Sequence, residues 1–236
     1  MMMKNQKSSV VVTIVFCSAS TLVFAQGAPM NLFPKKPAAA SKAISRAAPP
    51  PRVSDNSAAT IVKNANSYFN SIKTMVATFD QIGASGSRSS GRLYIQKPGK
   101  LRFDYNPPAP LQIIADGKSV AIRNKKTAKQ DMYYISQTPL KFLLRDKVDL
   151  ARDTKIMEVK SDSREAMIRI EDKATFGGTS RIRLYFDPKT YALRKWIVRD
   201  SQGYSTQVIL ADVDLKKKPS PALFKINYER LDTDQN

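Results

Sequence analysis

The chain has 236 residues, of which 39 are basic and 20 acidic, so its formal net charge at pH 7 is +19. It contains no histidine and a single cysteine, Cys17. These counts exclude Ser-His-Asp and Cys-His catalysis, histidine-ligated metals, intramolecular disulfides and thiolate zinc sites. The apolar fraction of 42% is ordinary for a globular protein, and the length fits one domain or two small ones.

The first 25 residues are typical of a secretory signal peptide. Lys4 and Lys7 provide a positive start, and the stretch from Val10 to Ala25 is uncharged and apolar or small. The alternative is a membrane anchor, which needs about 20 apolar residues, whereas this stretch is shorter and is diluted by serine and threonine. We expect cleavage after Ala25 and export to the periplasm.

Cys17 lies within this signal peptide. A lipidation site carries small residues directly before its cysteine, whereas Ile14, Val15 and Phe16 precede Cys17. We therefore expect Cys17 to be removed with the signal peptide, which leaves a mature protein without cysteine.

Residues 26–53 are rich in proline and alanine and carry basic but no acidic residues. Such a composition buries too little apolar surface to offset the entropy lost on ordering, and proline keeps the chain extended. We predict a disordered linker, which either tethers the following domain or touches anionic lipid through its positive charge. Residues 54–236 are then expected to form a single domain.

Apolar residues recur at helical spacing at the start of this domain. They are Ala58, Ile61, Ala65, Tyr68 and Ile72. The spacing predicts a helix within 54–72, with Ser54 or Asp55 as its N-terminal cap.

After this helix the pattern changes to an alternation of apolar and polar residues, clearest at 92–96, 101–105, 168–171 and 181–186. A period of two with one charged face predicts an antiparallel sheet that is apolar on one side. Turn residues separate about eleven predicted strands. These are 75–82, 91–97, 100–105, 111–115, 118–123, 129–135, 154–160, 165–172, 180–187, 191–199 and 205–213.

One segment interrupts the strands. A threonine suited to capping, Thr138, and a proline suited to the first helical position, Pro139, precede the apolar run Leu140–Leu144. We predict a short helix there and a second helical turn at 148–151. The fold class is therefore mainly β with helices, an α+β arrangement in which a strongly curved sheet surrounds an apolar concave face.

No catalytic motif is present. Asp212 and Asp214 lie two residues apart on one strand face, where a solvated surface is the ordinary interpretation. The sequence lacks a G-x-S-x-G elbow, an S-x-x-K pair and a glycine-rich phosphate loop. Basic and aromatic residues alternate at 100–103, but export makes anionic lipid a better partner than nucleic acid. We predict a binding protein that is not an enzyme and needs no cofactor or metal.

Five segments come after the predicted N-terminal helix in a recognisable order. They are Phe79-Asp80-Gln81 (F-x-Q), residues 91–103 (G-x-L-x-[basic]-P-x-x-[apolar]-x-[aromatic]), Asp116-Gly117-Lys118, the predicted helix at 138–144, and Pro221-Ala222-Leu223-Phe224 (P-x-x-F). Over roughly residues 57–228, these segments resemble those of the outer-membrane lipoprotein carrier protein family (LolA), in which the helix at 138–144 corresponds to a lid.

The resemblance implies an unclosed antiparallel β-barrel with an N-terminal helix and a lid helix over its mouth. It implies a periplasmic chaperone that takes acylated lipoproteins from an inner-membrane ABC exporter, shields their acyl chains, and delivers them to an outer-membrane acceptor. We expect a monomer. The acceptor role itself is disfavoured because Cys17 lacks a lipidation context.

Lys97 stands where a branch of this family carries an arginine that bonds backbone carbonyls of the lid. The resemblance therefore implies a role for Lys97 as lid latch. Lysine has no planar fork of donors, so its latch would be looser or differently built. The alternative for Lys97 is a solvated residue before the turn proline Pro98.

The apolar residues of the strands and the lid are the candidates for contact with acyl chains, although the pattern alone does not separate them from ordinary core. The facing of Trp196 is the least defined, because its position has the opposite parity to Leu193 and Ile197. The candidates are Leu93, Ile95, Leu101, Phe103, Ile113, Ile122, Leu140, Leu143, Leu144, Ile168, Ile170, Ile182, Leu184, Phe186 and Trp196.

Two other functions remain open at this stage. One is a periplasmic sensor of lipids or mislocalised lipoproteins with the same fold, which would usually carry a second domain for which this chain leaves no room. The other is a periplasmic enzyme, which would need a clustered carboxylate pair.

Overall fold

The computed structural model describes residues 57–139, 141–175 and 177–229, with only the backbone described for Ala174. The predicted signal peptide, the linker at 26–53 and Leu140 lie outside these residues. Within these residues, eleven strands form one antiparallel sheet, and the predicted strands are confirmed with ends that differ by at most three residues. The strands are β1 (Thr74–Ile82), β2 (Arg88–Gln96), β3 (Lys100–Tyr105), β4 (Leu111–Asp116), β5 (Ser119–Asn124), β6 (Gln130–Tyr134), β7 (Lys155–Ser161), β8 (Ala166–Thr175), β9 (Gly178–Phe186), β10 (Leu193–Arg199) and β11 (Ser205–Asp214).

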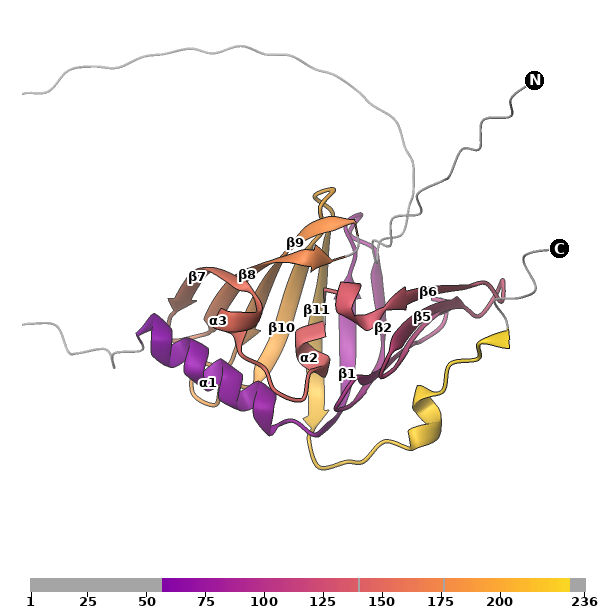
Figure 1. Ribbon diagram of the computed structural model, residues 1–236, viewed down its shortest axis with the longest axis horizontal. Coiled ribbons are helices and arrows are strands. Elements are labelled where there is room, and N and C mark those ends of the chain that lie inside the picture. The colour runs from indigo at the N-terminus through magenta and orange to yellow at the C-terminus, as the bar shows by residue number, and fades with distance from the viewer. Residues whose placement is uncertain (1–56, 140, 176, 230–236) are drawn as a thin grey trace, which may run out of the picture. The chain divides into compact units, whose positions relative to one another are not determined.

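The sheet consists of two meanders joined at their ends. Strands β1–β6 run outward in one direction and β11–β7 in the other, so that the spatial order is β6-β5-β4-β3-β2-β1-β11-β10-β9-β8-β7. The first and last strands pair at the centre, with Phe79 opposite Leu210. Because β6 and β7 are the two edges and do not pair with each other, the curved sheet is unclosed, as expected (Figure 1).

Alternation along the strands decides which side chains enter the core. In β9, Ile182, Leu184 and Phe186 are fully buried, whereas Arg181 and Arg183 are exposed. The same two-residue period buries alternate residues at 91–95 of β2, 101–105 of β3 and 166–172 of β8. The prediction of one apolar and one charged face is therefore confirmed.

A β-bulge in β10 resolves the facing of Trp196. Leu193 pairs with Phe186 of β9, but the next pair is Lys195 with Tyr185, so that Arg194 is an additional residue on β10. An extra residue reverses the parity of the strand that follows it. Leu193 and Trp196 therefore both point inward, at 2% and 1% exposure.

The N-terminal helix, α1, spans Ala58–Ser71 and buries Ile61, Ala65 and Phe69 against the sheet. Its cap is Ser57, whose hydroxyl oxygen accepts a hydrogen bond from the Thr60 amide at 3.3 Å. The prediction of a cap at Ser54 or Asp55 was wrong. Ser57 stands directly before the first helical residue, where a side-chain oxygen reaches the free amides of the first turn.

The segment between β6 and β7 contains a 3-10 turn, Ile135–Gln137, and two short helices, α2 (Lys141–Leu144) and α3 (Leu150–Asp153). The Thr138 hydroxyl donates to the Ile135 carbonyl oxygen at 2.9 Å and closes the 3-10 turn, and the Thr138 carbonyl oxygen accepts from the Lys141 amide at 3.3 Å. The predicted cap of α2 by Thr138 stays a prediction, because Leu140 lies outside the described residues. The predicted second turn lies slightly later than expected. Asp149 caps it by accepting from the Arg152 amide.

The three helices lie on the same side of the sheet (Figure 1). The ring of Phe69 in α1 links α1 to α2 and to the sheet, because it lies 5.7 Å from the ring of Phe142 in α2 and 5.6 Å from that of Phe186 in β9. Burial of one such ring contributes about 1.5–3 kcal/mol. None of the described helices is both long enough and apolar enough to cross a membrane.

Candidate binding cavity

A cavity of about 110 Å³ lies on the concave face of the sheet. The segment that crosses it, residues 135–139 together with α2, is called the lid segment below, and Thr138, Pro139 and Leu144 of this segment line the cavity. The remaining lining comes from both meanders, β1 and β3–β6 on one side and β9–β11 on the other. Ligand pockets usually occupy about 300–1000 Å³. With the lid segment in place, this cavity therefore has room for only a small part of a long ligand.

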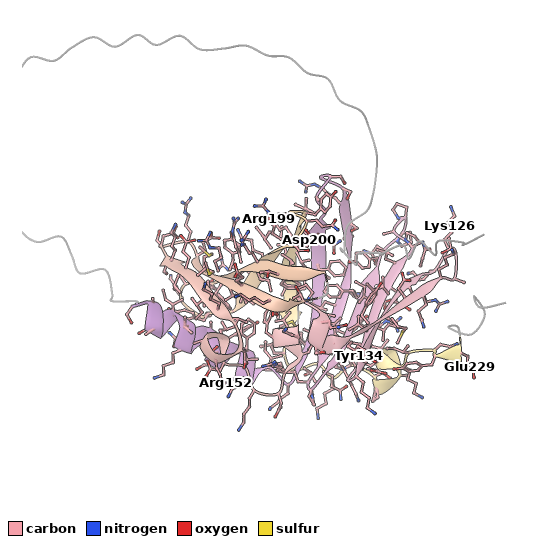
Figure 2. All side chains as sticks on the ribbon, turned by 45° about the horizontal axis from the view of Figure 1, so that its top comes forward. Lys126, Tyr134, Arg152, Arg199, Asp200 and Glu229 are labelled. Carbon is pink, nitrogen blue, oxygen red and sulfur yellow. The ribbon has the colours of Figure 1, made fainter. Side chains whose placement is uncertain are left out.

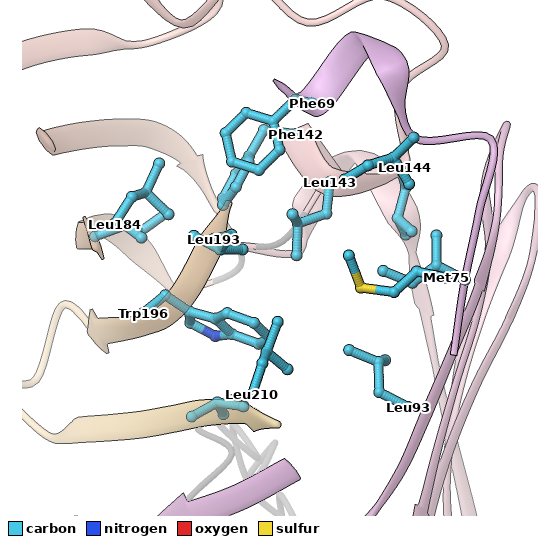
Figure 3. Packing of buried hydrophobic residues seen from close by; sticks show 14 of the residues in the cluster. Phe69, Met75, Leu93, Phe142, Leu143, Leu144, Leu184, Leu193, Trp196 and Leu210 are labelled. Carbon is cyan, nitrogen blue, oxygen red and sulfur yellow. The ribbon is translucent and has the colours of Figure 1, made fainter. Parts of the chain in front are cut away.

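Six of the fifteen residues that the sequence put forward line the cavity. They are Leu101, Phe103, Ile113, Ile122, Leu144 and Trp196. They come from β3, β4, β5, α2 and β10, so that the structure gathers them from elements spread over almost 100 residues of chain. Figure 3 shows Leu144 and Trp196 on opposite sides of the space between the lid segment and the sheet.

Eight others are buried in the core and do not belong to the cavity lining. They are Leu93, Ile95, Leu143, Ile168, Ile170, Ile182, Leu184 and Phe186. Seven of them lie on the inner face of strands, as the strand period predicted, and Leu143 lies in α2. The ring of Phe69 in α1 packs against one of them, Phe186. The fifteenth, Leu140, lies outside the described residues.

Apolar residues that the sequence reasoning did not put forward complete the lining. They are Ala115, Val120, Val198 and Val208. Val208 and Val120 lie on predicted strands, so alternation alone would have nominated them. Val198 follows the β10 bulge, which the sequence pattern does not reveal.

Polar groups also reach the cavity. The Tyr105 hydroxyl donates to Gln81 Oε1 at 2.7 Å, and both residues are buried and line the wall. Burial raises the pKa of Tyr105 above its ordinary value, so the hydroxyl keeps its proton at every physiological pH. Ser180, Asp200 and Thr206 add further polar atoms.

The turn between β2 and β3 contacts two of the helices. The Lys97 ammonium donates to the carbonyl oxygen of Phe69, in the last turn of α1, at 2.7 Å. Two residues later, the Gly99 amide donates to the carbonyl oxygen of Leu144, the last residue of α2, at 2.8 Å. The side chain of Lys97 thus binds α1 and not the lid segment. The contact with the end of the lid segment is made by the backbone amide of Gly99.

Burial disfavours the charged, protonated form of Lys97. The residue is 9% exposed, and loss of water lowers the pKa of its ammonium to about 8, with a smaller contribution from the positive charge of Lys73. The interpretation as a solvated residue before a proline is therefore wrong.

A buried ion pair holds the other end of α2. The Lys141 ammonium binds Asp172 of β8 through both carboxylate oxygens, at 3.0 and 2.9 Å, and also donates to the Ser136 carbonyl oxygen at 3.2 Å. Both side chains are buried. Sequence reasoning missed this pair, because a lysine in an apolar run and an aspartate in a strand carry no local signal that they meet.

A family model and several known proteins that are similar to this chain carry the same description. The family model described as outer membrane lipoprotein carrier protein LolA matches residues 70–227. The outer-membrane lipoprotein carrier protein of Nitrosomonas europaea is 26% identical over 176 residues, which cover 71% of this chain and 84% of the relative. That of Legionella pneumophila, strain Lens, is 29% identical over 169 residues, covering 68% and 82%.

Two solved structures were also similar at low identity. A LolA superfamily protein from Nitrosomonas europaea has a TM-score of 0.42 at 11% identity and covers 72% of this chain and 98% of its own. A putative outer membrane lipoprotein-sorting protein domain from Vibrio parahaemolyticus has a TM-score of 0.42 at 13% identity, with 71% and 94% covered.

Proposed function

This chain belongs to the outer membrane lipoprotein carrier protein LolA family, and from that premise we propose that it binds the acyl chains of lipoproteins in the cavity and carries them from the inner to the outer membrane. Its partners are then acylated lipoproteins, an inner-membrane ABC exporter and an outer-membrane acceptor. It works in the periplasm as a monomer after cleavage behind Ala25. The basic residues of 26–53 are available to touch an anionic membrane surface.

The observation that carries this proposal is the apolar cavity beneath the lid segment, whose helix α2 is held at both ends. Each acyl methylene buried is worth about 0.8 kcal/mol, so acyl chains do not cross water without cover. Leu144 and Pro139 close the space from one side, and Trp196 and Ile113 line the sheet. We infer that the lid segment moves aside and that the chains enter the space it vacates.

The closed lid also explains how a carrier releases its cargo. The lid segment must leave its own contacts before acyl chains enter, and the apparent affinity falls in proportion to the fraction of open molecules. Lys141–Asp172 and Gly99–Leu144 are the contacts that favour the closed form. Binding is thereby kept weaker than insertion into a bilayer, which allows delivery.

The test is to express the full exported chain in a bacterium, purify it from the periplasm without detergent, and identify bound lipoprotein by mass spectrometry. Val120→Phe fills the cavity without burying a charge, because Val120 is buried and lines it. The matched control is Val213→Phe, on a 39% exposed residue of β11. Circular dichroism and thermal unfolding establish that each variant is folded.

We expect acylated lipoprotein with the wild type and with Val213→Phe, and a loss of at least several-fold with Val120→Phe. A wild type free of acylated protein, or a folded Val120→Phe variant with undiminished cargo, contradicts the proposal. Delivery is tested separately by mixing the loaded protein with outer-membrane vesicles and measuring lipoprotein in the vesicle fraction.

A further inference from the structure

Polar residues gather at one end of the cavity wall, where three neighbouring strands meet the β10–β11 turn. Ser180 lies at the start of β9 and Thr206 at the start of β11, and both are buried, at 2% and 9% exposure. Thr206 pairs with Val198 of β10, and Asp200 follows two residues after Val198. All three line the cavity. Figure 2 shows Asp200 beside Arg199, where β10 ends.

The two carboxylate oxygens of Asp200 differ in their surroundings. Oδ1 accepts hydrogen bonds from the backbone amides of Gln202 and Tyr204, both at 2.9 Å, and so shapes the turn. Oδ2 is buried and has no hydrogen-bond partner among the residues that the structure describes. A buried acceptor without a partner costs stability, and a ligand group that donates to Oδ2 would remove this cost.

The other end of the cavity is mainly apolar, with Tyr133 of β6, which pairs with Val120, as the exception. Leu101, Ala115 and Val120 are opposite one another on β3, β4 and β5, and Leu144 covers them from the lid segment. The wall therefore changes from hydrocarbon at one end to polar at the Asp200 end. This polarity matches an amphiphile whose chains lie inside and whose head lies at the β10–β11 turn.

We propose that Asp200 Oδ2 accepts a hydrogen bond from the nitrogen of the lipid-modified N-terminal cysteine of the cargo. This inference rests on the proposed function. The lipid-modified cysteine offers ester carbonyls and a thioether, which only accept, and its nitrogen is its one donor group. That group is an amide N–H in an N-acylated lipoprotein or an ammonium in a diacylated one. A carboxylate oxygen selects that donor, because charge-assisted hydrogen bonds are the strong ones.

The test uses the full exported chain and three synthetic lipopeptides that share their S-diacylglyceryl chains. One carries an N-acetyl amide with its N–H, the second carries the same amide N-methylated, and the third carries a free amine, so that none of them gains an additional long acyl chain. Displacement of a fluorescent fatty acid from the protein gives the affinity of each. The three probes differ only at the nitrogen that Asp200 is proposed to bind.

The test variant is Asp200→Asn. Its Oδ1 can still accept from the Gln202 and Tyr204 amides, whereas an NH2 group, which only donates, replaces Oδ2. The control variant is Asp162→Asn in another turn. Asp162 Oδ1 accepts from the amides of Arg164 and Glu165 in the same way, but the residue is exposed and lies outside the cavity lining.

We expect the wild type and Asp162→Asn to bind the N-acyl or the free-amine lipopeptide about tenfold more tightly than the N-methylated one. Whichever of the two binds more tightly identifies the donor as amide or ammonium. In Asp200→Asn the preference is lost. Equal affinity of the wild type for all three lipopeptides overturns this inference and leaves the proposed function standing, whereas failure of every lipopeptide to bind overturns the proposed function.

Discussion

The ammonium of Lys141 in α2 lies 2.9 Å from Oδ2 of Asp172 in β8, and the two side chains are only 10% and 5% exposed. The pair spans 31 residues of sequence and ties the lid segment to the wall of the sheet. Its energetic weight lies in the cost of separating the charges, because a single buried charge left without its partner is far less stable than the pair.

The first prediction concerns this pair. Asp172→Leu leaves the Lys141 ammonium buried without its counter-charge, and we expect the free energy of unfolding to fall by about 3–5 kcal/mol. The double variant Lys141→Met with Asp172→Leu removes both charges and should recover most of that loss. Denaturant unfolding of the wild type, of Asp172→Leu and of the double variant measures these differences in the free energy of unfolding.

The exposed pair Lys73–Asp146 serves as the control, since its side chains are 72% and 62% exposed. Asp146→Leu should change the free energy of unfolding by no more than about 1 kcal/mol. Equal effects of Asp172→Leu and Asp146→Leu would mean that the Lys141–Asp172 pair contributes no more than a surface ion pair.

The second prediction concerns Gly99, which has a φ of +76° and donates its amide to Leu144. A Cβ at this position would lie 2.6 Å from the Cα of Gly117, so Gly99→Ala adds a steric clash to the cost of a left-handed conformation. Gly86 has a similar φ of +79° but open space around it. Gly86→Ala should therefore cost about 1–2 kcal/mol from conformation alone.

We expect Gly99→Ala to cost about 1–3 kcal/mol more than Gly86→Ala, as overpacking does elsewhere. Denaturant unfolding compares the two variants. If their costs are equal, then the turn moves away from Gly117 without resistance, and the 97–99 turn does not hold the lid segment rigidly.

The third prediction is a pH dependence carried by Lys97. Its pKa is lowered from 10.5 to about 8 in the folded protein, chiefly by burial. Between these two values the unfolded chain binds more protons than the folded one, and stability therefore rises with pH. Below about pH 8 the ammonium is charged in both states and its burial cost is constant.

Lys97→Met lacks the titrating group, so the difference in unfolding free energy, wild type minus Lys97→Met, should increase from about pH 8 towards pH 10.5 and be flat below pH 8. Urea unfolding at several pH values gives this difference. A difference that is constant up to pH 10.5 would show that Lys97 titrates at its ordinary pKa and is not desolvated.

The fourth prediction uses Trp196, the one tryptophan of the chain, which lines the cavity and is 1% exposed. A lipopeptide with brominated acyl chains should quench its fluorescence strongly, because bromine quenches indole only on close approach. The same lipopeptide without bromine should bind equally well and quench far less. Emission near the tryptophan maximum, followed during titration, gives both results.

Quenching of this kind should disappear in Trp196→Phe while displacement of a fluorescent fatty acid persists. Binding of the brominated lipopeptide without any quenching in the wild type would place the acyl chains outside the cavity.

The predicted strands agree with the structure because alternation is a local property. Leu101 and Phe103 face inward wherever β3 is placed, since neighbouring side chains of a strand point to opposite faces. The helix within 54–72 follows in the same way from its spacing. Its cap, Ser57, differs from the predicted residues because several capping residues stand close together at 54–57 and the choice depends on where the helix begins.

The cavity was less accessible to prediction. Leu184 and Trp196 share the inner face, but Leu184 is covered core whereas Trp196 lines the cavity, and Trp196 faces inward only because of the bulge at Arg194. The helices decide which inner side chains are covered, and their placement depends on contacts such as Lys141–Asp172 that link distant parts of the chain.

By itself, then, the amino-acid sequence determined the elements, the inner face of most strands and the family, because each of these follows from residue types at short, regular spacings. Only the tertiary structure decided where the cavity lies, which is over β3–β5 and over the part of β9–β11 next to Asp200. It also decided that the Lys97 ammonium binds a carbonyl oxygen of α1, and that one carboxylate oxygen of Asp200 has no hydrogen-bond partner among the described residues. These features arise where segments far apart in sequence meet, and the meeting depends on how the curved sheet and the helices fill space together.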